Sequence, residues 1–524
     1  MSSEALSTST VSSNEHHNKT TSNSKLLSLF YKGFRSRFVW KDGVVGSQAV
    51  CTEPLEESIS WINFFLDLLY VAVIANITVI LTSCELNTRT IAVVYAVSIA
   101  LFKFRWGIDE HSIRFYQDDL FHRTLYFIYI MGIYFMGSDI SYMYNPGTIV
   151  SAAHRFLASE TSGQEYCHID QQYYTKFAVG FIMCHISITI IYSVAFFQDA
   201  SRKVIDQYFF RTVLIFISTI IMIVSTLDLS EGAQISLLVL ASEIELAVPI
   251  IIVFCRKYLN YTGSLGKIHY PVNYMISQER LGIYILLYLG EGVIKAMQMT
   301  LNKGDYTYIY SVANMVLIFL LGVQFFDRVQ GKEGQIHACR RHMFWGLVYL
   351  QVGHRFLAFA LLFVIAGMTD HSASGGLQLS FGCGFSTLIM ICMRMLHKGI
   401  GHKFSTPRRM LYLLVELLVC VSHFLVILAD HHHISHGDRV VIHAAITLVY
   451  VIWDTFGILS EGLLSNVSSK GPPAQLHLVH TESQSADKPI DIESQSADKP
   501  IDIEVGHYSD LSGNQEEVGR ISLN

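Results

Sequence analysis

Four ionisable residues lie inside long apolar runs, where a charged side chain is costly unless it has a partner or water. Asp67 follows WINFFL, Glu245 follows ASEI, and Glu291 and Lys295 lie within LGEGVIKAM. Carboxylates at such a depth can bind protons or cations in alternation with a substrate. We therefore take Asp67, Glu245, Glu291 and Lys295 as a candidate substrate or ion pathway.

Asp67 has a structural interpretation as well as a functional one. At helical spacing it shares a face with Asn63, Tyr70 and Thr78, and that polar face is expected to point into a helix bundle. A carboxylate on such a face can serve a transport pathway, or it can hydrogen-bond neighbouring helices together. The sequence leaves both roles open.

Glu291 also has two interpretations, because Lys295 lies one turn after it on the same helix face. The two charges can neutralise each other as a structural ion pair, or Glu291 can be a titratable group of the pathway. Gly290 and Gly292 flank the acid and are expected to let another helix approach closely.

Other polar residues in the apolar runs are Glu243, His354, Arg355, Glu416, His423, His443 and Asp454. Histidines in such positions are more often packed and hydrogen-bonded than metal-binding. The run DHHHISHGD at 430–438 offers imidazole ligands, but its spacing matches no fixed zinc pattern. The sequence also contains no P-loop, GxSxG or HExxH motif. We therefore expect no catalytic residues, no metal site and no cofactor.

The elements that must position these residues are membrane helices. The chain is 51% hydrophobic and only 15% charged, against about 25% charged residues in a soluble domain. Runs of roughly 20 apolar residues can cross the hydrocarbon as helices. About twelve such runs occur, at 61–82, 89–108, 122–142, 177–197, 207–227, 234–255, 281–298, 307–326, 343–367, 377–396, 409–429 and 439–460. The predicted fold is an all-α polytopic transmembrane bundle of about twelve spanning helices over residues 58–460.

Lys and Arg are concentrated in alternate loops, at 202–211, 256–280, 328–341 and 394–409. Because cytoplasmic loops carry the excess of Lys and Arg, these loops and both termini are expected in the cytoplasm. We expect the plasma membrane rather than an internal membrane.

Polar segments flank the predicted bundle. Residues 1–57 are expected to be a partly disordered cytoplasmic tail. Its basic, aromatic stretch at 25–41 either lies on the inner membrane surface or is a disordered flank. Residues 461–524 are expected to be a disordered cytoplasmic tail, with ESQSADKPIDI repeated at 482–492 and 493–503.

The apolar runs also divide into two sets of six, at 61–255 and 281–460, which predicts two parallel repeats. Asp67 and Glu291 fall in the first run of each set. Cys84 and Cys167 fall in loops expected outside, where they either form a disulfide or remain free thiols.

Three stretches of this sequence resemble the low temperature requirement A (LtrA) family. WINFFLDLLYVAVIANI at 61–77 is similar to its opening signature, DD-x2-HR at 118–123 to its second motif, and ISQERLGIYILLYLGEGVI at 276–294 to its third. The likeness covers roughly residues 58–460. The corresponding positions are Asp67, Asp118, Asp119, His122, Arg123, Glu279, Arg280, Gly290 and Glu291, with weaker similarity at Glu245, Pro249 and His354. The resemblance implies a multi-pass membrane protein of unsettled activity.

The sequence departs from the family pattern near its central acids. Asn63 stands where the family usually has an acid before the aromatic pair, and Lys295 is unusual. We predict a transporter or an ion or proton pathway; the alternative is a membrane receptor or scaffold without transport activity. Expected partners are membrane lipid and a small solute, cation or proton. The net charge of −6 gives no indication of nucleic-acid binding.

Overall fold

The structure is a computed structural model of the chain. It describes residues 61–114, 120–146, 167–198, 205–227, 229–247, 274–300, 306–328, 346, 348–370, 373–398, 407–429 and 434–468. The predictions for residues 1–57, for Asp118 and Asp119, and for the repeats at 482–503 lie outside these residues.

The described part of the chain is almost entirely helical, as the apolar runs predict. Its earlier helices are α2 (Trp61–Ser83), α3 (Thr88–Arg114), α4 (Leu120–Ser138), α5 (Ile140–Met143), α7 (Gln171–Gln198), α8 (Ile205–Ser225), α9 (Glu231–Glu243) and the 3-10 turn η1 (Ile244–Ala247). The later ones are α11 (Tyr274–Thr300), α12 (Tyr306–Arg328), the π-helical turn η3 (Val348–Gly353), α15 (His354–Thr369), α16 (Ala373–Lys398), α18 (Pro407–Ala429) and α19 (His436–Ser468).

Eight helices in the described ranges are long and apolar enough to cross a membrane. They are α2, α3, α7, α11, α12, α15 together with η3, α16 and α18. The other four predicted runs overlap α4, α8, α9 and α19. The prediction of a transmembrane helical bundle is therefore confirmed, and the count of about twelve spans stays a prediction.

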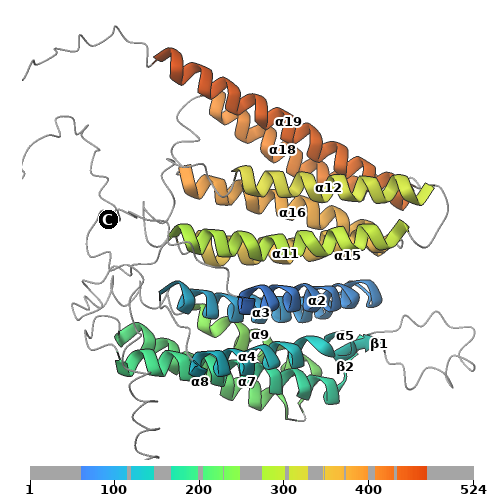
Figure 1. The fold of residues 1–524 in the computed structure, drawn as a ribbon. Coiled ribbons are helices and arrows are strands. Elements are labelled where there is room, and N and C mark those ends of the chain that lie inside the picture. The colour runs from blue at the N-terminus through green and yellow to red at the C-terminus, as the bar shows by residue number, and fades with distance from the viewer. Residues whose placement is uncertain are drawn as a thin grey trace, which may run out of the picture. The chain divides into compact units, whose positions relative to one another are not determined.

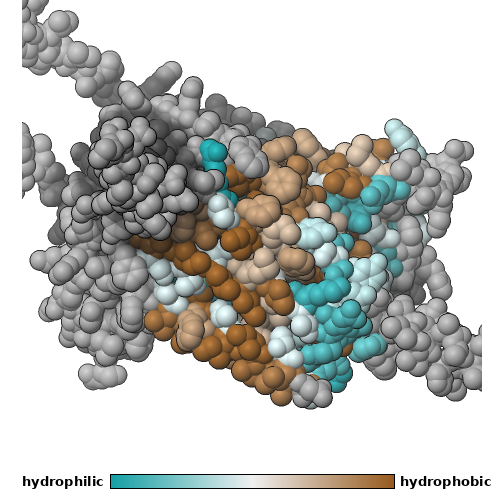
Figure 2. Space-filling model, turned by 60° about the horizontal axis from the view of Figure 1, so that its bottom comes forward, coloured by the Kyte–Doolittle hydropathy of each residue, from teal (hydrophilic) through white to brown (hydrophobic). Residues whose placement is uncertain are grey.

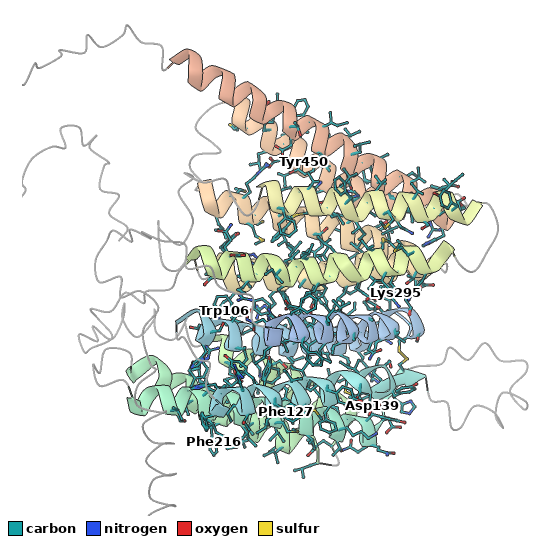
Figure 3. The ribbon with its side chains drawn as sticks, viewed as in Figure 1. Trp106, Phe127, Asp139, Phe216, Lys295 and Tyr450 are labelled. Atoms are coloured by element: carbon teal, nitrogen blue, oxygen red, sulfur yellow. A yellow bond between two sulfur atoms is a disulfide. The ribbon has the colours of Figure 1, made fainter. Side chains whose placement is uncertain are left out.

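Large apolar side chains on the outside of the bundle fit lipid as the surrounding solvent. Phe127 on α4 is 62% exposed and Phe216 on α8 is 64% exposed, and both lie within apolar helices (Figure 3). Figure 2 shows hydrophobic residues covering much of one face, with hydrophilic residues gathered toward one end. Such a continuous apolar surface is typical of a face that contacts lipid or another protein.

Helix α3 lies at the centre of the described helices. Of its apolar stretch 83% is buried, against 33% of that in α18. It packs against α2, α7, α9, α11 and α15. Polar side chains in the buried part of α3, such as Lys103 and Arg105, therefore face other helices.

The helices form two sets of neighbours (Figure 1). Helices α2 to α9, here called the first half, pack mainly with one another, and so do α11, α12, α15, α16 and α18 of the second half, which also includes α19. In each half the helices of the third and fourth predicted runs make the most extensive contact, α4 with α7 and α15 with α16. The halves meet where α2 and α3 contact α11 and α15. This shared pattern supports the two-repeat prediction, which stays a prediction.

Glycines let the backbones approach at both of these contacts. A Cβ on Gly180 of α7 would lie 2.5 Å from the carbonyl oxygen of Gly132 on α4. A Cβ on Gly382 of α16 would lie 2.5 Å from the amide nitrogen of Val364 on α15. Because real Cβ atoms cannot approach backbone atoms so closely, a larger residue would push either pair of helices apart.

The glycines beside Glu291 differ from each other. A Cβ on Gly292 would lie 2.6 Å from Cδ1 of Ile318 on α12, so the predicted close approach is confirmed there. A Cβ on Gly290 would meet nothing within 4 Å, so the same prediction is wrong for Gly290. The two positions are two residues apart and therefore lie on different sides of the helix, and only one side packs against α12.

A short strand pair joins the connection between α5 and α7. Strand β1 (Tyr144–Pro146) pairs antiparallel with β2 (Cys167–Ile169). Cys167 forms a disulfide with Cys84, which follows the end of α2. Of the two possibilities that the sequence left open, the structure thus contains the disulfide. It lies at the end of the helices that the Lys and Arg pattern predicts to face outside.

Candidate functional site: buried charges between the helices

Glu245 lies where a predicted spanning helix loses its regular geometry. Helix α9 ends at Glu243, inside the apolar run predicted at 234–255, and the chain continues as the 3-10 turn η1. The sequence offers a reason: Pro249 cannot donate an N–H to the carbonyl of Glu245, and in an α-helix its ring would clash with that carbonyl.

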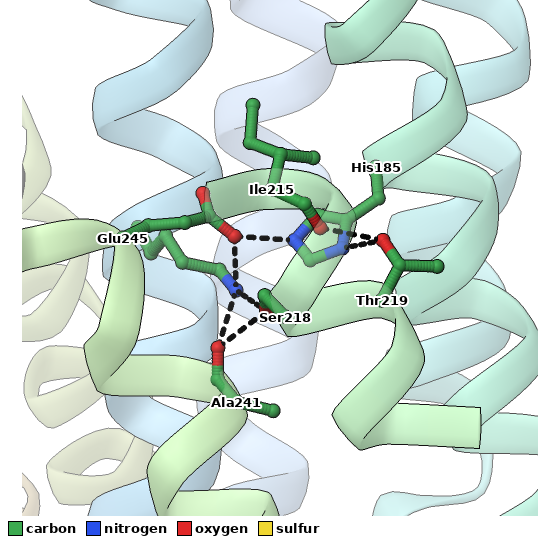
Figure 4. A network of polar contacts seen from close by, with 7 residues as sticks. His185, Ile215, Ser218, Thr219, Ala241 and Glu245 are labelled. Carbon is green, nitrogen blue, oxygen red and sulfur yellow. Dashed lines mark hydrogen bonds and ion pairs between the residues drawn. The ribbon is translucent and has the colours of Figure 1, made fainter. Parts of the chain in front are cut away.

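The carboxylate of Glu245 meets two cationic or titratable side chains from other helices (Figure 4). Its Oε1 lies 3.0 Å from Nζ of Lys103 on α3 and 2.7 Å from Nε2 of His185 on α7. All three side chains are at most 5% exposed. A buried ion pair is tolerated when hydrogen bonds satisfy the remaining polar atoms.

Helices α8 and α9 supply those hydrogen bonds. The Lys103 ammonium donates to the carbonyl oxygen of Ala241 at 3.2 Å and contacts the hydroxyl of Ser218 at 3.4 Å. Ser218 also donates to Ala241, at 2.6 Å. Ala241 lies in the last turn of α9, where carbonyls lack helical N–H partners and remain available to other donors.

The hydrogen bonds of His185 determine where a proton lies. The Thr219 hydroxyl lies 2.8 Å from the carbonyl oxygen of Ile215 and 2.8 Å from Nδ1 of His185, and it can donate its single hydrogen to one of them. If it donates to Ile215, Nδ1 carries a hydrogen; if it donates to Nδ1, the imidazole hydrogen lies on Nε2. Nε2 faces Glu245 at 2.7 Å, and two lone pairs at that distance would repel each other. A proton must lie between His185 and Glu245, on either partner.

Asp67 belongs to a second cluster. Its Oδ1 lies 2.6 Å from Nη1 of Arg105, and the same guanidinium contacts Asp109 one turn along α3 at 2.9 Å. The Arg105 side chain is 2% exposed and lies over the ring of Tyr70. Arg105 thus joins α2 to α3 with two acids around one cation.

Glu291 pairs with Lys295 within α11, as the spacing predicts. Glu291 Oε1 lies 3.7 Å from Nζ of Lys295. The Glu291 side chain is 2% exposed, whereas that of Lys295 is 21% exposed (Figure 3). At 3.7 Å this is the longest of the contacts made by the three candidate acids.

The four predicted pathway residues therefore lie in three separate places. Asp67 pairs with Arg105, Glu245 with Lys103 and His185, and Glu291 with Lys295. Within the described residues, no basic side chain forms ion pairs with two of these three acids. On the polar face of α2, Tyr70 and Thr78 are buried as predicted, whereas Asn63 and Asp67 are partly exposed.

A further ion pair connects the two halves. Oε2 of Glu243 on α9 accepts a hydrogen bond from Arg355 on α15 at 2.7 Å. Its Oε1 accepts one from the hydroxyl of Tyr95 on α3 at 2.6 Å. Glu243 precedes Glu245 by two residues. The Glu245 cluster therefore lies next to an ion pair between the halves.

The second half has a cluster of its own. Arg394 on α16 forms ion pairs with Glu416 on α18 and with Asp454 on α19, the latter at 3.0 Å. The Arg394 and Glu416 side chains are buried, and that of Asp454 is 11% exposed. One cation here serves two acids from two neighbouring helices.

The family-motif positions are spread over both halves. His122 is buried at the start of α4 with its ring stacked on that of His111. Glu279 is exposed, and Arg123 and Arg280 both have partners. His354 is buried, and its Nδ1 lies 3.0 Å from the carbonyl of Tyr349 near the start of η3.

Sequence reasoning missed Lys103, Arg105, Asp109 and His185. A signal was present for the first three, because basic residues in an apolar run require buried acids, and Asp109 follows Arg105 at i+4 spacing. His185 stands alone in its run and cannot be distinguished by sequence from a packed histidine. Its partners come from later helices that only the fold brings near.

Comparison with known proteins gives one match. The family model described as bacterial low temperature requirement A protein (LtrA) matches residues 58–452. No curated protein matches the chain, and no solved structure does either. The matched residues include the Glu245 and Asp67 clusters of the first half and most of the second half.

Proposed function

Because this chain belongs to the LtrA family, and is thus a multi-pass integral membrane protein, we propose that it is a transporter or an ion or proton pathway in which Glu245 binds the coupling proton or cation. Asp67, Glu291 and Lys295 contribute further polar sites along the interior. The alternative, a receptor or scaffold without transport activity, has no observation in its favour among the described residues.

The proton between His185 and Glu245 carries this proposal. It is held at 2.7 Å between two buried groups, 1% and 5% exposed. Either group can carry it, so the site can release it when the surroundings change. Titratable groups inside a membrane domain are typical of proton relays in transporters.

Lys103 gives the site a second state. With the proton lost, the Glu245 carboxylate remains paired with the ammonium at 3.0 Å. A substrate cation that approaches Glu245 must compete with Lys103, which would remain held by the Ala241 carbonyl and the Ser218 hydroxyl that it already contacts. Exchange of this internal cation for an external one is the basis of the proposed alternation.

The backbone at Glu245 supports the same function. Transporter sites are commonly formed by discontinuous helices, whose freed carbonyls and mobile ends surround the substrate. Here α9 ends two residues before Glu245, and the carbonyl of Ala241 is already used as a ligand for an ammonium group. The end of the regular α-helix and the charge cluster thus lie at the same place.

Proton and cation flux in liposomes containing the purified protein tests this proposal. Glu245→Gln keeps the shape and the hydrogen bonding but removes the titratable charge, and it is expected to abolish flux in a folded protein. Glu231→Gln is the matched control, since Glu231 begins the same helix and pairs with the exposed Arg89. Normal flux in well-folded Glu245→Gln protein would eliminate the assigned role, and no flux from wild-type protein would favour the receptor alternative.

We also propose that both termini are cytoplasmic and that the protein lies in the plasma membrane. The Lys and Arg bias supports this orientation, and so does the Cys84–Cys167 disulfide, because disulfides form on the oxidising, outer side of a membrane. Single cysteines introduced at 201–203 and 403–409 are expected to react only with reagents that enter the cytoplasm. Labelling of either loop from outside would overturn the orientation.

A further inference from the structure

Three metal-binding side chains meet in the second half, away from the charge clusters. Cys383 of α16, His423 of α18 and His443 of α19 are buried, and one ligand atom of each lies within 4.8 Å of the others. They are far apart in sequence and come from three different helices. The sequence predicted single packed histidines here and no metal site.

The two imidazoles face each other through the same kind of nitrogen. Nδ1 of His423 lies 2.9 Å from Nδ1 of His443, with the rings nearly parallel at 23° and their centroids 5.1 Å apart. In the metal-free protein a proton must lie between these nitrogens, because two lone pairs would repel each other. A metal ion can replace that proton and bind both lone pairs.

The remaining nitrogens fit the same interpretation. Nε2 of His443 lies 2.9 Å from the hydroxyl of Ser380, which can accept its N–H and so fix the ring with Nδ1 directed at His423. Histidines that bind metals almost always donate their other N–H in this way. His423 differs, because its Nε2 is buried and has no hydrogen-bond partner within the described residues. Binding through Nδ1 leaves this costly unsatisfied nitrogen in place, whereas a ring turned to present Nε2 to the ion would satisfy it.

The donor set selects the class of metal. A thiolate and two imidazoles favour soft or borderline ions such as Zn²⁺ and Cu⁺, whereas Mg²⁺ and Ca²⁺ require oxygen ligands. Three protein ligands leave a coordination position open, unlike closed four-ligand structural zinc sites. Binding would release the Cys383 proton and the shared histidine proton, so it is expected to weaken as pH falls.

We infer that Cys383, His423 and His443 form a binding site for one thiophilic transition-metal ion, Zn²⁺ or Cu⁺, with Ser380 as the residue that orients His443. The site is independent of the flux proposed at Glu245, since its residues lie on α16, α18 and α19 and the Glu245 cluster lies on α3, α7, α8, α9 and η1.

Cobalt substitution of the purified full-length protein tests the site directly. Co²⁺ bound to a cysteine thiolate gives a charge-transfer absorption in the near ultraviolet. Wild-type protein is expected to show this band, and its absorbance should saturate at one Co²⁺ per protein molecule. Added Zn²⁺ should displace the Co²⁺ and remove the band. Absence of the band in folded wild-type protein would overturn the proposal, whatever the variants do.

Variants then identify the ligands. Cys383→Ser is expected to abolish the band, whereas Cys392→Ser, which changes an exposed cysteine of the same helix, should keep it. His423→Ala and His443→Ala should each fail to bind the one Co²⁺ that wild-type protein binds. Ser380→Ala should weaken the affinity for Co²⁺ about 10-fold to 100-fold. A Cys383→Ser protein that binds Co²⁺ as wild type does would show that Cys383 is not a ligand and would overturn the proposed site.

Two further controls separate the alternatives. Replacement of His431, His432 and His433 by alanine removes three imidazoles that lie close in sequence to His423 and His443. The protein should still bind one Co²⁺ through Cys383. Competition with a Cu⁺-specific chelator and, separately, with a Zn²⁺ chelator ranks the two ions. If neither ion binds with a dissociation constant in the micromolar range or tighter, the histidine pair is a packing feature and the metal site is rejected.

Discussion

The two halves share a packing pattern but gather different partners around it. In the first half one acid, Glu245 of the sixth predicted span, contacts His185 of the fourth span and Lys103 of the second. In the second half one cation, Arg394 of the fourth span, contacts Asp454 of the sixth and Glu416 of the fifth. If the halves are repeats, a basic residue on the fourth span and an acid on the sixth have been kept, while the third member of the cluster differs.

The ends of the halves differ as well. In the first half a long connection between α5 and α7 contains the strand pair and the disulfide. In the second half α15 ends at Thr369 and α16 begins at Ala373, so the corresponding connection is short. A short connection holds two helices together by its length alone, whereas a long connection needs another constraint. The disulfide supplies that constraint.

The charge comparison gives the largest expected effect on stability. Lys103→Met and Arg394→Met each break a buried ion pair, and each should lower the free energy of unfolding by about 3–5 kcal/mol. Adding Glu245→Gln should restore most of the loss in the first case. The second case should need both Glu416→Gln and Asp454→Asn. Denaturant unfolding in detergent measures these differences, and full recovery of Arg394→Met by Glu416→Gln alone would show that Asp454 is not a partner.

The disulfide should have the next largest effect. Cys84→Ser opens a loop closed over a sequence separation of 83 residues and is expected to cost about 2–4 kcal/mol. Reducing agent should lower the melting temperature of wild-type protein and leave Cys84→Ser unchanged. Cys392→Ser, which changes a free cysteine of the second half, serves as the control. Equal melting temperatures for wild type and Cys84→Ser would mean that the strand pair holds the connection unaided.

The glycine contacts should have the smallest effect, and a similar one in both halves. Gly180→Ala and Gly382→Ala each place a methyl group 2.5 Å from a backbone atom and should cost about 1–3 kcal/mol. Gly290→Ala should be neutral or stabilising, since the position is open and alanine favours helix by about 1 kcal/mol. Thermal unfolding compares the three variants. A loss confined to one half would argue against a shared packing pattern.

The comparison also separates two kinds of buried polar residue. Arg105, Lys103 and Arg394 each have acidic partners at ion-pair distance, so they satisfy the requirement that a charge in a low-dielectric interior be paired. His185 and His423 are different, because each lies at hydrogen-bond distance from another titratable group, Glu245 at 2.7 Å and His443 at 2.9 Å. Function is proposed at the second kind of position in both halves.

The sequence by itself determined the class of fold. Apolar runs of sufficient length in a chain with few charges must be helices in lipid, because only a helix satisfies its own backbone there. Periodicity also placed Asp67 on a face expected to point inward, and the i,i+4 spacing made the Glu291–Lys295 pair one of two interpretations. These results depend on residues within one helix, so no knowledge of neighbouring helices was needed.

Only the tertiary structure decided which charges meet. Glu245 finds its partners on α3 and α7, and Cys383, His423 and His443 come together from three helices. Helix position in a bundle follows from packing between surfaces, such as the Gly180 and Gly382 contacts, and one sequence does not state which surfaces pair. The sequence therefore supplied the chemical groups, and the packing of the helices determined which of them could act together.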